Sequence, residues 1–132
     1  MKHAHSVVLS ALLLLLLSAC GSSNSALSGP HGDTIRRDSP RLVGDWADAE
    51  TGTIFHVEMV DGVAQVTSIV DSDGEVFDIR EQGWKDGHLT WTYHVPSTGY
   101  VNTFVVTNIG TEELGSTWSG TGGEGTERLL RQ

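Results

Sequence analysis

The chain has 132 residues, with eight Lys and Arg against seventeen Asp and Glu, and a formal net charge of −9. This excess of acidic side chains repels phosphate groups, which argues against nucleic acid as a partner. The length allows one small hydrophobic core and excludes a multidomain protein.

The first segment of the chain has the pattern of a secretory signal. Met1 and Lys2 give it a charged start, and a largely apolar run follows from Val7 to Leu17. This run is too short to span a membrane comfortably, and small residues follow it. We therefore predict a signal peptide over residues 1–19.

The signal ends in Leu17-Ser18-Ala19-Cys20, which resembles the lipobox of bacterial lipoproteins and contains the only cysteine of the chain. The resemblance implies cleavage before Cys20 and a lipid on its sulfur, which would attach the protein to a membrane of the bacterial cell envelope. In that family an Asp directly after the cysteine favours retention in the inner membrane. Gly21 stands there, which implies the outer membrane in a cell that has one. A leftover thiol, an intermolecular disulfide and an uncleaved anchor are the alternatives.

The next segment is rich in Ser, Gly, Pro and Asp and shows no periodic apolar pattern. Such a composition is typical of a flexible linker. We therefore predict a lipidated Cys20 followed by a tether over residues 20–40. Residues 41–132 then form one small domain, without a disulfide if Cys20 carries lipid.

Turn signals recur through this domain every eleven to thirteen residues. Asp-Gly is the dipeptide that best fits a type I′ hairpin turn, and it occurs three times. The Asp-Gly pairs and the later Gly-containing turn signals stand at 61–62, 73–74, 86–87, 97–99, 110–111 and 121–123. This rhythm is typical of consecutive antiparallel hairpins in a barrel or sandwich.

The runs between the turns alternate apolar and polar residues. The clearest is Leu89, Trp91, Tyr93 and Val95, whose neighbours in the sequence are polar. A period of two indicates strands, and no window shows an apolar repeat at helical spacing. The expected strands are 41–47, 53–60, 63–70, 75–81, 87–95, 100–109, 112–119 and 125–131.

We predict an all-β fold, a small antiparallel up-and-down meander of about eight strands that forms a closed or nearly closed barrel. An open sheet of this size would leave two bare edges that invite aggregation, and closure removes them. The interior of an eight-stranded barrel is filled by side chains or holds one small ligand. A two-sheet β-sandwich is the alternative.

The first expected strand contains Gly44-Asp45-Trp46, and the last contains Arg128 and Arg131. This pattern resembles the calycin superfamily, which includes the lipocalins and has a Gly-x-Trp in its first strand. The resemblance implies that Trp46 closes one end of a barrel and packs beneath an Arg from the last strand. Of the two arginines, Arg128 is the expected partner, because a residue near the terminus frays.

Aromatic side chains are the best candidates for a binding site. Trp84 stands at a strand end beside a turn, where an exposed ring suits a ligand or partner contact. The predicted ligand-binding residues are Trp84, Trp91, Tyr93, Phe55 and Phe104. We predict a non-catalytic module that binds a small apolar ligand or a partner segment at a barrel mouth. The alternative is a structural or accessory lipoprotein whose solid barrel contacts another envelope protein.

No motif predicts an enzyme, a metal site or a cofactor. His88 and His94 are six residues apart on one expected strand, about 20 Å at roughly 3.3 Å per residue, so they cannot hold one metal ion. The chain has no Gly-x-Ser-x-Gly elbow and no free cysteine beyond the lipobox. We therefore assign no catalytic residue.

Overall fold

The computed structural model describes residues 31–132, so the predicted signal peptide, Cys20 and most of the predicted tether lie outside the described residues. The described part contains one helix followed by eight strands. These are α1 (Gly32–Leu42), β1 (Gly44–Asp48), β2 (Ile54–Val60), β3 (Val63–Val70), β4 (Asp78–Lys85), β5 (His88–His94), β6 (Val101–Ile109), β7 (Glu113–Gly120) and β8 (Gly123–Arg131).

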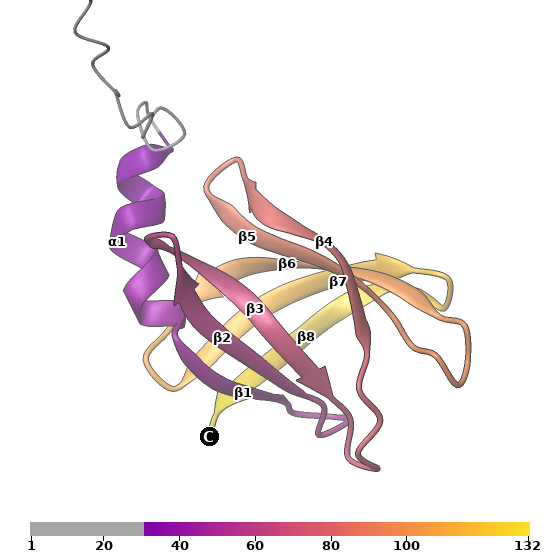
Figure 1. Cartoon of the computed structure of the whole chain (residues 1–132). Coiled ribbons are helices and arrows are strands. Elements are labelled where there is room, and N and C mark those ends of the chain that lie inside the picture. The colour runs from indigo at the N-terminus through magenta and orange to yellow at the C-terminus, as the bar shows by residue number, and fades with distance from the viewer. Residues whose placement is uncertain (1–30) are drawn as a thin grey trace, which may run out of the picture.

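All eight strands belong to one antiparallel sheet with the order β3-β2-β1-β8-β7-β6-β5-β4 (Figure 1). The first and last strands are therefore neighbours, and Trp46 lies opposite Arg131 in their register. Each remaining pair in the order is consecutive in the chain, which is an up-and-down meander. The predicted all-β fold with eight strands in a nearly closed barrel is confirmed.

The barrel is left incomplete between β3 and β4. Only one isolated bridge, between Val70 and Val76, links their backbones near one end. Further along, the Gln82 side chain takes the place of a backbone partner. Its Nε2 donates to the carbonyl of Val66 at 3.0 Å, and its Oε1 accepts the Val66 N–H at 2.8 Å. The Trp84 indole donates to the carbonyl of Ala64 at 3.1 Å. Side chains thus close most of this seam.

Two of the three Asp-Gly pairs form hairpin turns of the predicted type I′. Asp61 and Asp86 have φ of 49° and 51°, and the glycine after each also has positive φ, as a type I′ turn requires. The third pair, Asp73-Gly74, also lies in a turn that reverses the chain, into the antiparallel bridge between Val70 and Val76, but the turn is not of type I′, because Gly74 has positive φ and Asp73 does not. There Asp71 Oδ1 accepts the N–H groups of Asp73 and Glu75 and shapes a wider loop. The next strand, β4, accordingly begins at Asp78 rather than at residue 75.

The prediction of an irregular tether up to residue 40 is wrong from residue 32 onward, where α1 begins. Ile35 and Leu42 lie seven residues apart on its buried side, and Ser39 lies between them. The Ser39 hydroxyl accepts the N–H of Ala64 at the free edge of β3, at 3.0 Å. Contacts with one end of the barrel, which α1 covers, therefore stabilise the helix. It is not long and apolar enough to cross a membrane.

The core fills the barrel beneath α1. Its largest fully buried side chains are Trp46, Trp91, Phe55, Leu42, Ile69, Leu89, Leu114 and Leu129. In Figure 1, α1 lies at the end where the β2–β3, β4–β5 and β6–β7 turns gather, and the other loops lie at the opposite end. The two ends of the barrel are therefore built differently.

Candidate binding site at the open barrel end

The barrel end opposite α1 contains a hollow of about 270 Å³, which we call the mouth. Six rings from six strands or loops line it: Phe55, Phe77, Tyr93, Tyr100, Phe104 and Trp118. Its polar lining includes Asp48, Asn102 and Glu127. A mostly apolar hollow with a few polar groups is the usual form of a small-molecule site.

The mouth contains three of the five predicted ligand-binding residues, namely Phe55, Tyr93 and Phe104. The prediction for Trp91 is not supported, because its ring lies deeper and stacks on Phe104 with centroids 5.5 Å apart. Trp84 does not line the mouth either. Its indole is half-buried at the β3–β4 seam, where it bonds to Ala64.

Four of the mouth rings, Phe55, Phe77, Tyr93 and Phe104, form one connected cluster. Phe55 and Phe104 have centroids 5.3 Å apart, and Phe77 stacks on Tyr93 at 5.2 Å. These separations are typical of favourable aromatic pairs. The cluster gives the mouth a floor and walls that are held in place by core packing.

Two carboxylates occupy inward-facing strand positions at this end. Asp48 follows Trp46 by two residues on β1, and Glu127 precedes Leu129 by two on β8, so each continues an inward, core-forming stripe. Asp48 lies opposite Leu129 in the sheet, which makes Glu127 its diagonal neighbour. Across from Glu127 stands the small, buried Ser116. The pairing of β1 with β8 thus brings both acids to one place.

Asp48 is only 6% exposed. Its Oδ1 accepts the N–H groups of Glu50 and Thr51 at 2.8 and 3.1 Å, which shapes the β1–β2 turn. Its Oδ2 accepts no hydrogen bond from any residue between 31 and 132, and no Lys, Arg or His lines the mouth. The carboxylate therefore has one oxygen available to a ligand.

The electrostatics of the mouth are those of an uncompensated negative site. Burial raises the pKa of Glu127 above its ordinary value, and the charges of Asp48 and Glu50 raise it further, while the Trp118 indole opposes the shift. Burial also raises the pKa of Tyr93; Asn102, whose amide donates to the Tyr93 hydroxyl at 3.4 Å, opposes the shift, and the two acids add to it. All these groups favour a neutral or cationic occupant.

These acids were not among the predicted site residues. Their sequence signal is that each continues the period of two set by buried neighbours, Trp46 before Asp48 and Leu129 after Glu127. A charged residue in phase with core residues departs from the pattern that a barrel interior requires. Closure of the barrel pairs β1 with β8, and this pairing places the two acids side by side.

The opposite end holds Gly44 and Trp46 of the predicted barrel-end group, and the third member, Arg128, needs a correction. Arg131, not Arg128, lies over the Trp46 ring, 4.1 Å from guanidinium carbon to ring centroid. Arg128 is exposed and pairs with Glu113 at 2.5 Å. The register explains this, because Arg131 is directly opposite Trp46, and backbone hydrogen bonds to Glu112 and Asp45 hold the chain end in place.

Gly44 makes this arrangement possible. Its φ is +134°, and a Cβ there would lie 2.8 Å from Nη1 of Arg131. A side chain at this position would be strained and would push the guanidinium off the Trp46 ring. The Gly-x-Trp pattern therefore has a structural role at the covered end of the barrel, away from the mouth.

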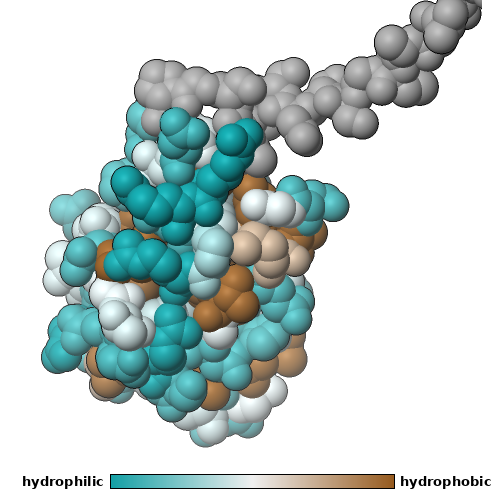
Figure 2. All heavy atoms as spheres, turned by 90° about the vertical axis from the view of Figure 1, so that its left-hand side faces the viewer, coloured by the Kyte–Doolittle hydropathy of each residue, from teal (hydrophilic) through white to brown (hydrophobic). Residues whose placement is uncertain are grey.

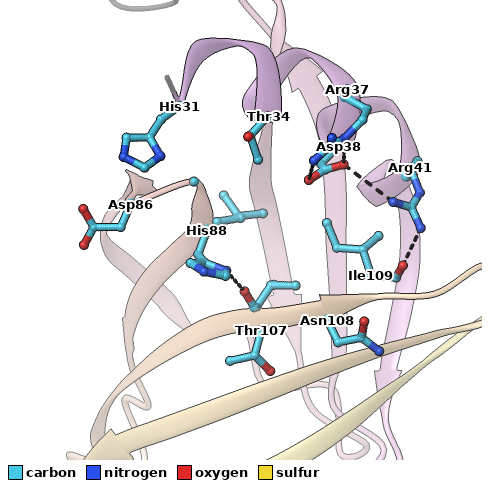
Figure 3. Close-up of a pocket in the computed structure, with 13 residues that line it drawn as sticks. His31, Thr34, Arg37, Asp38, Arg41, Asp86, His88, Thr107, Asn108 and Ile109 are labelled. Atoms are coloured by element: carbon cyan, nitrogen blue, oxygen red, sulfur yellow. Dashed lines mark hydrogen bonds and ion pairs between the residues drawn. The ribbon is translucent and has the colours of Figure 1, made fainter. Parts of the chain in front are cut away.

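A second hollow, of about 350 Å³, lies between α1 and the strands β5 and β6 (Figure 3). Its charged groups largely pair with one another: Arg37 and Arg41 both contact Asp38, and Arg41 also donates to the carbonyl of Ile109. His88 bonds to the carbonyl of Val106 at 2.8 Å. Figure 2, which faces α1, shows that hydrophilic residues cover much of this side. Of these contacts, the bond from Arg41 to Ile109 attaches the helix to the barrel.

Among residues 31–132, no group of three His, Cys, Asp or Glu side chains is placed to hold a metal ion. A scan against protein-family models, a search of curated proteins and a search of solved structures each found no match to the chain. The function is therefore inferred from the fold and from the geometry of the mouth.

Proposed function

We propose that this protein is a non-catalytic binding module that holds a small, largely apolar ligand in the mouth. The observation that carries the proposal is the hollow itself, a preformed recess lined by six rings at the one barrel end that α1 leaves uncovered. Its volume is close to the lower limit of roughly 300 Å³ for small-molecule sites. A ligand of about a dozen heavy atoms or fewer is in keeping with this size.

We further propose that the module is attached to the cell envelope through lipid on Cys20, in the outer membrane of a cell that has one. Eleven residues, 21–31, separate that cysteine from the start of α1. They would span at most about 40 Å when fully extended. Because α1 covers the end opposite the mouth, the anchor would leave the mouth facing away from the bilayer. A ligand could then enter from the aqueous side.

The experiment that tests the binding function is native mass spectrometry of the full-length chain, purified from its own host. We expect a fraction of the protein to carry one small molecule. Thr53→Phe adds a ring to a buried position that lines the mouth, so this variant should lose the bound mass. Thr126→Phe, on the exposed side of β8, is the matched control and should keep it.

Protein that is free of ligand in every preparation would contradict the proposal. The barrel would then act as a structural or accessory lipoprotein that contacts another envelope protein through its outer face. The well-filled core beneath α1 is compatible with that role.

A further inference from the structure

We propose that the ligand of the mouth is a compact organic ammonium ion, whose charge lies against Asp48 and Glu127 and whose apolar part packs on the mouth rings. The inference rests on the proposed function, because it concerns the chemistry of a ligand in the same hollow. Three features of the mouth support it: its unpaired carboxylates, the kind of groups around them, and its size.

The first feature is negative charge without a partner. A carboxylate inside a protein is costly unless a cation or several hydrogen bonds compensate it. Asp48 is 94% buried, since its exposed fraction is 6%, and its Oδ2 accepts no hydrogen bond from any described residue. Glu127 forms no ion pair with any residue of the described part. The mouth lacks the cation that this charge calls for.

The acids also interact unfavourably with each other. The charge of Asp48 is one of the causes that raise the pKa of Glu127. A cation bound between them would remove this repulsion and form charge-assisted hydrogen bonds, which are stronger than neutral ones. The folded chain thus holds an unfavourable arrangement that a ligand of the right charge would relieve.

The second feature is the aromatic surround. Phe55, Tyr93, Phe104 and Trp118 present rings to the same hollow as the two acids. An ammonium group is attracted to the face of an aromatic ring, most strongly to Trp and Tyr, when it lies within roughly 6 Å of the centroid. A bare metal ion would gain little from these rings. The combination therefore favours an organic cation over a metal.

The third feature is size. A hollow of about 270 Å³ that ends on the ring cluster admits a compact amine and excludes a bulky amphiphile. The strands are short, and the core fills the barrel below the rings, which leaves little depth for a long acyl tail.

The test is a set of titrations of the full-length chain with three probes of matched shape at neutral pH. The probes are benzylammonium, benzyl alcohol and benzoate, which differ in charge but share a ring. Binding is followed by NMR shifts of the Trp118 indole, which lines the mouth. We expect benzylammonium to bind at least about tenfold more tightly than benzyl alcohol, which corresponds to about 1.4 kcal/mol. Benzoate should not bind measurably.

Two variants locate the charge that is responsible. Glu127→Gln and Asp48→Asn each remove one negative charge, and Asn can keep the Oδ1 hydrogen bonds that shape the β1–β2 turn. Each should weaken benzylammonium binding by about tenfold and leave benzyl alcohol binding unchanged. Glu124→Gln, an exposed position of β8, makes the same change of charge and should have no effect.

The outcomes separate the two proposals. If benzyl alcohol binds as tightly as benzylammonium, the ammonium inference is overturned while the mouth remains a binding site. If benzylammonium binds selectively but equally well to both mouth variants, the inference is overturned as well. If none of the three probes binds, both the inference and the proposed function are overturned.

Discussion

At the residue scale, Arg131 connects three parts of the covered barrel end through one guanidinium group. It donates to the carbonyls of Arg41 and Val43 at 2.9 and 3.0 Å and to that of Thr111 at 2.8 Å, while its plane lies over Trp46. Cations at the end of a helix also interact favourably with its dipole. The residue therefore links α1, β8 and the β6–β7 turn.

We expect Arg131→Ala to lower the free energy of unfolding by about 2 kcal/mol, because it removes charged hydrogen bonds and a cation–π contact. Arg128→Ala is the matched control, and it should have little effect, because Arg128 is exposed and its ion pair with Glu113 is surrounded by water. Urea denaturation of both variants measures the difference. Equal losses would contradict the assignment of Arg131 as the partner of Trp46.

The raised pKa of Glu127 leads to a second prediction at the residue scale, on how the stability of the fold depends on pH. Its pKa is raised in the folded protein, so folding favours the protonated carboxyl. Its contribution to stability is therefore present below the ordinary glutamate pKa and is lost as the pH rises through the folded value. Glu127→Gln should raise the free energy of unfolding at pH 7, and this advantage should disappear near pH 4.

Denaturant titrations at the two pH values check the prediction for Glu127. The control is Glu124→Gln, on the same strand but exposed, which should show no comparable gain at pH 7. A variant that is less stable than the wild type at pH 7 would show that Glu127 is already compensated in the free protein. It would also weaken the case for a cationic ligand.

At the scale of elements, β3 and β4 are the two edge strands of the sheet, and the seam between them is the place where the barrel is not closed by a backbone ladder. Edge strands expose unpaired N–H and C=O groups, which invite pairing with other chains. Here Ser39 accepts the N–H of Ala64, Trp84 bonds to its carbonyl, and Gln82 pairs both backbone groups of Val66. Side chains thus replace the backbone ladder along the edge of β3.

Gln82→Ala should therefore lower the free energy of unfolding by about 1–2 kcal/mol, the worth of two hydrogen bonds. Hydrogen exchange at the Val66 amide should also speed up, because its acceptor is gone. Glu81→Ala, which removes a neighbouring exposed side chain, is the control and should leave that amide protected. Unchanged Val66 exchange in the Gln82 variant would mean that the seam has another support.

At the scale of the whole molecule, α1 lies at one end of the barrel (Figure 1), and the residues that line the mouth belong to the other end. This arrangement determines where the mouth would face if the predicted lipid anchor is present. The chain enters the domain through α1, so the anchor side and the binding side would be separated by the full barrel. A ligand site that faces the aqueous space is the arrangement that a membrane-attached binding module needs.

Cys20→Ser tests the anchor. If the lipobox is functional, the variant should accumulate as an uncleaved precursor without lipid, which intact-protein mass spectrometry detects. Ser23→Ala, beyond the lipobox, should mature normally and serves as the control. Normal maturation of the Cys20 variant would contradict the lipoprotein resemblance and leave the fold and the mouth unaffected.

Local features of the sequence were enough to predict the class of fold. Apolar alternation and Asp-Gly turns are short-range signals, and closure of the meander made the first and last strands neighbours, as the structure confirms. The helix α1 was missed because its buried side contains Asp38 and Ser39 as well as Ile35 and Leu42, and because Pro40 lies within it. Tertiary contacts, such as the bond from Ala64 to Ser39, stabilise what propensity alone does not.

The sequence by itself determined the strand rhythm, the barrel and the three rings Phe55, Tyr93 and Phe104, since inward positions follow directly from a period of two. Only the tertiary structure decided that Arg131 covers Trp46, that the barrel is incomplete at β3 and β4, and that Asp48 and Glu127 meet in the mouth. The physical reason is register. A shift of two residues between β1 and β8 would keep every side chain on its face, yet it would move Arg131 away from Trp46 and change how the two acids face each other.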